Sequence, residues 1–124
     1  MSRYLLIGLG GLLGANARFI VSMWSANKWG DVFPYGTLII NISGSFILCF
    51  LTMALSERWI THPGLRLALM VGFLGSYTTF STFSLESLQL IQNGALWPSF
   101  IYVCGSVIGG GLAGYVGLLL GRLL

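Results

Sequence analysis

The middle of the chain reads GSYTTFSTFS over residues 75–84, a polar stretch inside a long apolar segment. Its ten residues include six Ser or Thr hydroxyls and one tyrosine. Gly72, Gly75 and two successive threonines continue a helix poorly, because glycine is conformationally free and threonine is stiff at χ1. The stretch predicts a helix broken near mid-membrane, where irregular backbone is tolerated only around a cavity or a buried ion site.

The composition predicts a chain whose exterior faces lipid. Of the 124 residues, 56% are hydrophobic and only 7% are charged, whereas soluble domains are about 25% charged. In lipid, every backbone amide must be paired within a helix or a closed barrel. The apolar runs are long and do not alternate with period 2, which favours helices. We therefore predict an all-α, multi-pass protein of the plasma (inner) membrane.

Four segments of the sequence are long enough to cross a hydrocarbon core of about 30 Å, which takes roughly 20 helical residues. They cover about residues 4–24, 36–56, 65–91 and 97–120 of one transmembrane domain, 1–124. The connections between them are short, and we place Asn27 and Lys28 in the first. No soluble domain fits in such connections, so function must reside within the helices or at their ends.

The charges are scattered and nearly balanced across the membrane. The net charge is +3, but the six Lys and Arg residues stand singly. This argues against nucleic-acid binding and favours anchors that flank the spans. Four basic residues fall on the side of the termini and two on the other, a weak bias towards cytoplasmic termini. Such a chain could insert both ways, which would permit an antiparallel homodimer.

Glycines at four-residue spacing form a packing signal. Gly10 and Gly14 form one such pair, and Gly117 and Gly121 form another. Small residues at this spacing let helix backbones approach closely where lipid gives no hydrophobic driving force. We predict tight packing of the four spans, with a second copy of the chain.

Two aromatic residues and one amide stand out as candidates for an anion path. Phe80 and Phe83 share a helix face, and the edge of an aromatic ring is positive. Two rings turned edge-on could line the path, although composition alone favours ordinary packing, as for most apolar stripes. Asn41 carries an amide with two donors inside the second span. Its alternative role is a hydrogen bond between helices.

Other polar residues of the spans allow two interpretations each. Tyr102 and Ser106 lie one turn apart and would extend a polar stripe, or they only pack helices. Glu86 is the only carboxylate within a span; it is either a proton-sensitive gate or a group paired near the interface. Arg18 either attracts anions into a vestibule or snorkels to the interface.

Three motifs resemble, in order along the chain, those of the Fluc (CrcB-type) family of fluoride channels. They are GGLLGANAR at residues 10–18, PYGTLIIN at 34–41 and GFLGSYTTFSTFSLE at 72–86. The resemblance covers nearly the full length, and the third motif is the most specific because no packing rule generates it. Two departures affect its details. Ser76 and Tyr77 replace a commoner Gly-Leu pair, and Gly110 occupies a position often held by Ser.

The resemblance implies a fluoride-selective channel that exports fluoride passively and so gives fluoride resistance. It implies a dual-topology antiparallel homodimer with two fluoride pathways, each lined by both subunits. It also implies a structural sodium ion, not transported, held at the dimer interface by the backbone carbonyls of Gly75 and Thr78. The implied fluoride pathway comprises Thr37, Asn41, Phe80, Ser81, Thr82, Phe83, Tyr102 and Ser106.

Other functions fit the sequence less well. A proton-coupled small multidrug exporter also uses four helices, but it needs a carboxylate deep in the first span, which holds Arg18 and no Asp or Glu. A non-conducting membrane assembly subunit would use the polar stretch only for packing. An enzyme is not expected, because His62 lies in a loop and no nucleophile–base pair has the spacing for covalent catalysis.

Overall fold

The computed structural model describes residues 2–55 and 62–123, and every element within these residues is helical. The elements, in chain order, are α1 (Ser2–Trp29), α2 (Tyr35–Ala54), α3 (Pro63–Arg66), the π-helix η1 (Leu67–Leu74), α4 (Gly75–Tyr77), α5 (Phe80–Gln92) and α6 (Leu96–Arg122).

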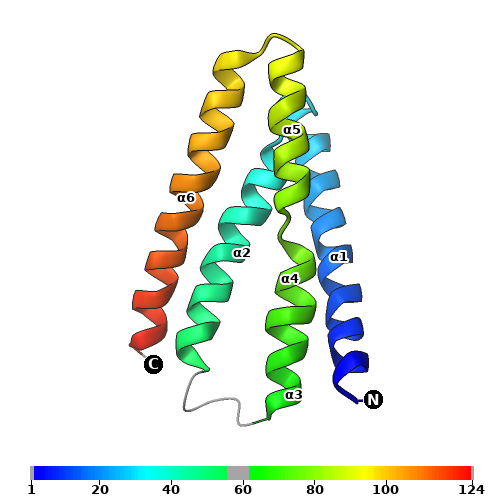
Figure 1. Cartoon of the computed structure of the whole chain (residues 1–124), viewed down its shortest axis with the longest axis vertical. Coiled ribbons are helices and arrows are strands. Elements are labelled where there is room, and N and C mark those ends of the chain that lie inside the picture. Colours follow the sequence, from blue (N-terminus) through cyan, green and yellow to red (C-terminus); the bar gives the residue numbers. More distant parts are fainter. Residues whose placement is uncertain (1, 56–61, 124) are drawn as a thin grey trace.

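The helices run roughly along one axis and form two close pairs (Figure 1). α6 packs along α2, and α1 packs along η1 and α4. Both chain ends lie at one end of the bundle (Figure 1), called here the terminal end. Residues 30–34 and 93–95 connect helices at the opposite end, called the loop end.

Among the described residues, three helices are long and apolar enough to cross a membrane. They span Arg3–Trp29, Tyr35–Ala54 and Leu96–Arg122, in the regions where the sequence predicts spans over 4–24, 36–56 and 97–120. The remaining predicted span, 65–91, falls on the elements from α3 to α5: α3, η1 and α4 follow one another without a gap over residues 63–77, and α5 begins at Phe80.

The prediction that Asn27 and Lys28 lie in a connection is wrong, because α1 continues to Trp29. The chain turns only at Gly30, whose φ of +80° suits glycine and whose N–H donates to the Ala26 carbonyl. The Lys28 ammonium lies 5.2 and 5.0 Å from the ring centroids of Trp24 and Trp29. Aromatic rings and a long cationic side chain at a helix end are typical of a membrane–water interface.

The predicted interruption of the third segment lies at Thr78 and Thr79. α4 ends at Tyr77, and α5 begins at Phe80. Thr78 has ψ 158° and Thr79 has φ −152° and ψ 119°, so both residues are extended. The gap between α4 and α5 is visible at mid-height of the bundle (Figure 1). The eight π-helical residues of η1 before it were not predicted, and π-helical turns are frequent at functional sites.

Glycines bring the paired helices into backbone contact. A Cβ added at Gly14 of α1 would collide with the backbone carbonyl of Phe73 in η1. A Cβ added at Gly117 of α6 would collide with the carbonyl of Phe46 in α2 and lie 3.0 Å from the Phe50 amide nitrogen. Backbone atoms cannot swing aside as a side chain does. The predicted role of these glycines in close packing is therefore confirmed within one chain.

Replacing Gly117 by alanine should weaken the α2–α6 pair. The added methyl group meets backbone atoms, and such overpacking costs about 1–3 kcal/mol. Gly111→Ala on the same helix is the control, because nothing lies within 4 Å of its added Cβ. We expect Gly117→Ala to lower the thermal unfolding midpoint in detergent and Gly111→Ala to leave it unchanged or higher. Equal midpoints would contradict this account of the packing.

Candidate functional site

The helix break is held by a reciprocal pair of hydrogen bonds between Asn41 and Thr79. Asn41 Nδ2 donates to the Thr79 carbonyl at 3.0 Å, and the Thr79 N–H donates to Asn41 Oδ1 at 2.9 Å. Thr79 is only 9% exposed, so its backbone groups would be costly to leave unpaired. The side-chain amide of Asn41 on α2 thus hydrogen-bonds both the N–H and the carbonyl of Thr79.

The same contacts take helical donors away from two backbone carbonyls. In a continuous α-helix the Thr79 N–H would bond the carbonyl of Gly75, and the Thr82 N–H would bond that of Thr78. Instead, the Thr79 N–H bonds Asn41, and the Thr82 N–H donates to Thr79 Oγ1 at 3.2 Å as α5 begins. Carbonyls freed in this way at a broken helix suit a small cation. Gly75 and Thr78 are the two residues that the resemblance assigns to sodium.

Beside the break lies a cavity of about 300 Å³, called here the central hollow. It is lined by side chains of α2, the break, α5 and α6, among them Asn41, Thr78, Phe80, Phe83 and Ser106. The rings of Phe80 and Phe83 have centroids 5.8 Å apart, and Phe80 is 79% exposed. Ser106 Oγ is buried and has no hydrogen-bond partner among the described residues. Its hydroxyl therefore remains available to a bound ion.

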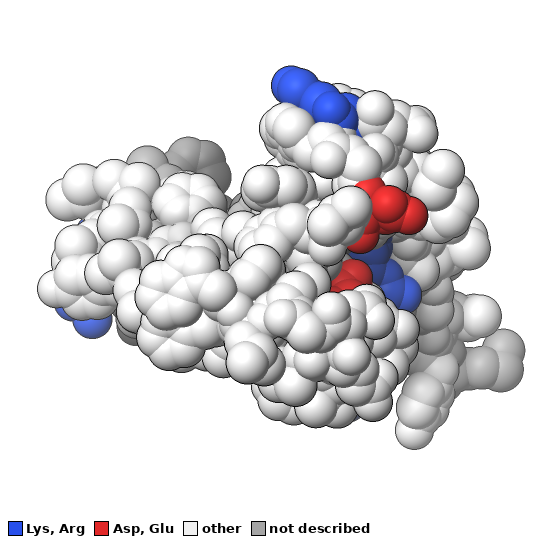
Figure 2. Space-filling model, turned by 90° about the horizontal axis from the view of Figure 1, so that it is seen from above, with Lys and Arg blue, Asp and Glu red and all other residues white. Residues whose placement is uncertain are grey.

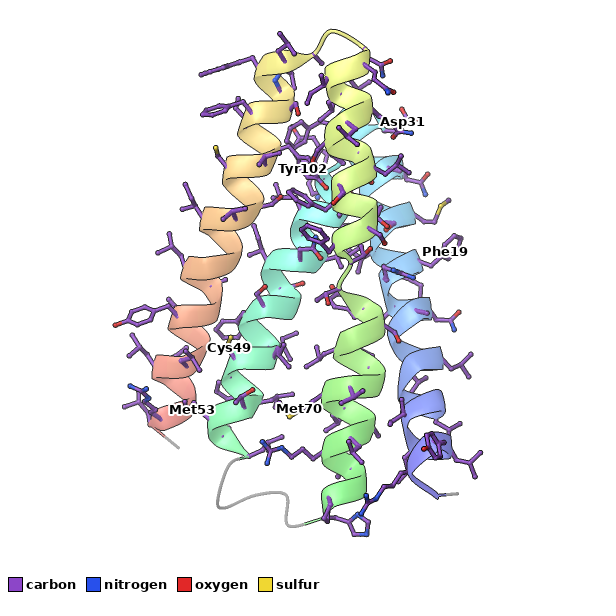
Figure 3. All side chains as sticks on the ribbon, in the orientation of Figure 1. Phe19, Asp31, Cys49, Met53, Met70 and Tyr102 are labelled. Atoms are coloured by element: carbon purple, nitrogen blue, oxygen red, sulfur yellow. The ribbon has the colours of Figure 1, made fainter. Side chains whose placement is uncertain are left out.

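Glu86 is held by two hydroxyl groups nearer the loop end. Thr37 Oγ1 donates to its Oε1 at 2.9 Å, and the Tyr102 hydroxyl donates to its Oε2 at 2.7 Å. Tyr102 is fully buried, and its side chain points into the bundle from α6 (Figure 3). Both carboxylate oxygens of Glu86 are thus hydrogen-bonded to neutral donors.

Two further cavities lie on the loop side of the break. The side hollow, of about 340 Å³, is lined by Arg18, Thr37 and Thr82 among others. The mouth hollow, of about 350 Å³, is lined by residues that include Asp31 and Glu86. Arg18 is the only basic residue among those lining the three hollows. Viewed from the loop end, acidic and basic groups lie close together in a depression (Figure 2).

The structure therefore brings most of the predicted site residues together. Asn41, Phe80, Phe83 and Ser106 line the central hollow, whereas Thr82 and Arg18 line the side hollow. Thr37 and Glu86 line the mouth hollow, and Tyr102 joins this group through its bond to Glu86.

Two residues predicted at the site lie apart from these cavities. Ser81 is exposed and lines none of the three hollows. Its Oγ lies 3.5 Å from Thr79 Oγ1. Gly75 is also exposed, on the surface of α4. The central role of Thr79 was not predicted. Its signal in the sequence is a hydroxyl residue at an N-cap, three positions before Thr82.

Comparisons with known proteins agree on one family. Residues 5–118 match the family described as CrcB-like protein, Camphor Resistance (CrcB). A fluoride-specific ion channel FluC of Chloroflexus aurantiacus is 42% identical over 122 residues, which cover 98% of this chain and 97% of the relative. The protein of that name from Rhizobium meliloti is 39% identical over 100% of this chain and 99% of its own. One from a Synechococcus species is 45% identical over 94% and 90%.

Replacing Asn41 by leucine should destabilise the fold. The change leaves the N–H and the carbonyl of Thr79 without partners, which costs about 1–3 kcal/mol for a buried group. Asn16→Leu is the matched control, because Asn16 is exposed and its amide bonds the Leu12 carbonyl of its own helix. Thermal unfolding in detergent should show a lower midpoint for the Asn41 variant only. A midpoint equal to that of wild type would show that other contacts hold the break.

Proposed function

The chain belongs to the CrcB-like protein family, and on that basis we propose that it is a fluoride-specific ion channel. It is a multi-pass membrane protein. The observation that carries the proposal is identity of about 40% to fluoride-specific ion channels over nearly the whole of both chains. These relatives are named as channels and not as enzymes, in agreement with the prediction of a non-enzymatic protein.

The chemistry of the central hollow supports this proposal. Fluoride is small and strongly hydrated, so a path must replace its water with other hydrogen-bond donors. The hollow offers the Ser106 hydroxyl, and Phe80 and Phe83 can present positive ring edges. Neutral donors bind an anion firmly enough for entry and weakly enough for exit, as conduction requires. We expect passive flow down the electrochemical gradient.

We assign the side hollow to the entrance of this path. Arg18 lines it together with the hydroxyl residues Thr37 and Thr82, so it carries a positive charge and neutral donors at the same place. The positive charge of Arg18 attracts anions to the entrance, and Arg18 does not line the central hollow. Asn41 and Thr79 lie next along the route, because Thr79 lines both the side hollow and the central hollow.

We further propose that the elements from α3 to α5 form a fourth crossing and that a second, antiparallel copy completes the channel. Phe80 is 79% exposed beside the break, and Gly75 is exposed on α4. A broken helix with freed backbone groups is tolerated in a membrane only where protein covers it. An antiparallel partner would cover this face and bring the equivalent break next to it, giving two fluoride pathways.

Sodium at this interface is a further part of the proposal. The carbonyls of Gly75 and Thr78 lose their helical donors, so each copy can offer two oxygen ligands. Two copies together would offer four. A sodium ion there would join the two breaks electrostatically and would not be transported. Carbonyl oxygens of broken membrane helices are typical ligands of Na⁺.

Fluoride efflux from liposomes that contain the purified chain tests the function directly. A fluoride electrode should record rapid efflux for wild type. Phe80→Ile removes a ring edge and Asn41→Asp introduces a negative charge, so we expect each to slow efflux about tenfold, or about 1.4 kcal/mol in barrier height. Phe100→Ile is the control, because Phe100 is exposed on α6 and stacks on Trp97. Full efflux in both test variants would refute the assigned path, and none in wild type would refute the function.

Removal of sodium tests the proposed ion site separately. When N-methylglucamine replaces sodium from purification onwards, efflux should fall towards the background of protein-free vesicles. Returning sodium to both sides should restore it, because the ion acts structurally. The fluoride gradient and ionic strength are kept the same throughout. Undiminished efflux without sodium would remove the sodium site and leave the fluoride function standing.

A further inference from the structure

Phe33 lies at the loop end, and its ring contacts the ring of the buried residue Tyr102. It belongs to the turn between α1 and α2, where the Tyr35 N–H donates to the Phe33 carbonyl at 2.8 Å. The Phe33 ring lies 4.7 Å from the ring of Tyr35 and 5.7 Å from that of Tyr102, between centroids. The planes of Phe33 and Tyr102 meet at 80°, an edge-to-face arrangement that aromatic pairs prefer.

The ring of Tyr102 is held on two sides. Phe33 contacts it from the loop turn, and Phe83 contacts it from α5 with centroids 5.3 Å apart. The third constraint is the hydrogen bond from its hydroxyl to Glu86. The side chain is 0% exposed, so the ring has little room to move.

Tyr102 also contacts residues that line two of the hollows. Phe33 and Glu86 line the mouth hollow, whereas Phe83 lines the central hollow. The Tyr102 ring packs against both Phe33 and Phe83, so it contacts one lining residue of each cavity. Its hydroxyl bonds Glu86, a further lining residue of the mouth hollow.

We propose that Phe33 is a positioning residue for fluoride passage and that it acts by holding the ring of Tyr102. This inference rests on the proposed channel function. A phenol hydroxyl can turn about its C–O bond while the ring stays in place. With the ring fixed, the same proton can serve Glu86 or a passing fluoride ion. If the ring were loose, the hydroxyl would leave the position from which it reaches both.

The first test replaces the Phe33 ring and keeps its bulk. In liposomes, Phe33→Leu should slow fluoride efflux about fivefold, an effect of the size expected from the loss of one edge-to-face ring pair. Phe33→Tyr keeps the ring edge, so its efflux rate should stay within about twofold of the wild-type rate. Phe100→Leu, an aromatic loss on the exposed face of α6, should have no effect. Rates are normalised to inserted protein, and Phe33→Met replaces Phe33→Leu if the latter does not insert.

The second test asks whether Phe33 acts through the hydroxyl. Tyr102→Phe keeps the ring and removes the group that Phe33 is proposed to position. Adding Phe33→Leu to Tyr102→Phe should therefore slow efflux no further, because residues that act as a unit are not additive. Slowing that multiplies in the double variant, a wild-type rate in Phe33→Leu, or failure of Phe33→Tyr to restore the rate would each overturn the inference. If wild type itself releases no fluoride, the proposed function fails instead.

Discussion

The reciprocal bond between Asn41 and Thr79 is the constraint on which the rest of the site depends. A membrane helix cannot stop at mid-depth unless its freed backbone groups find partners. Asn41 supplies both a donor and an acceptor to one extended residue, so the chain can break there. Because the Thr79 N–H is engaged, the carbonyl of Gly75 is released. The stability of the break and the release of the Gly75 carbonyl therefore have one cause.

Close helix packing fixes the positions of the two residues that form this bond. Gly44 lies one turn after Asn41 on α2, and a Cβ added there would collide with the Thr78 methyl group. α2 thus contacts the break at two successive turns, with the amide of Asn41 on the first and Gly44 on the second. On the other side, Gly72 of η1 lies against α1, where an added Cβ would lie 2.6 Å from the Ile7 carbonyl oxygen. The π-helix fits there because glycines stand on both surfaces, with Gly72 of η1 facing Gly10 and Gly11 of α1.

The sequence was sufficient to predict the helical class and the interruption, because composition and a hydroxyl-rich run are local signals. Asn41, Phe80 and Phe83 could be selected from their own chemistry, whereas Thr37, Gly75 and Thr78 were selected only through the family resemblance. The π-helix over Leu67–Leu74 was not predicted, since a change from α to π hydrogen bonding leaves no distinct residue pattern. The partners of Glu86 lie 49 residues before it and 16 after it, so only the packed structure reveals them.

Under the proposed function, Glu86 is a carboxylate that stands beside an anion path. Both of its oxygens accept hydrogen bonds from hydroxyls, so neutral dipoles oppose its charge without cancelling it. Under the proposed function, an anion that arrives here must draw a proton of Thr37 or Tyr102 away from a strong acceptor. Fluoride is a strong acceptor itself and can do so. A carboxylate at this point therefore admits an ion according to its hydrogen-bonding strength, which its negative charge alone could not achieve.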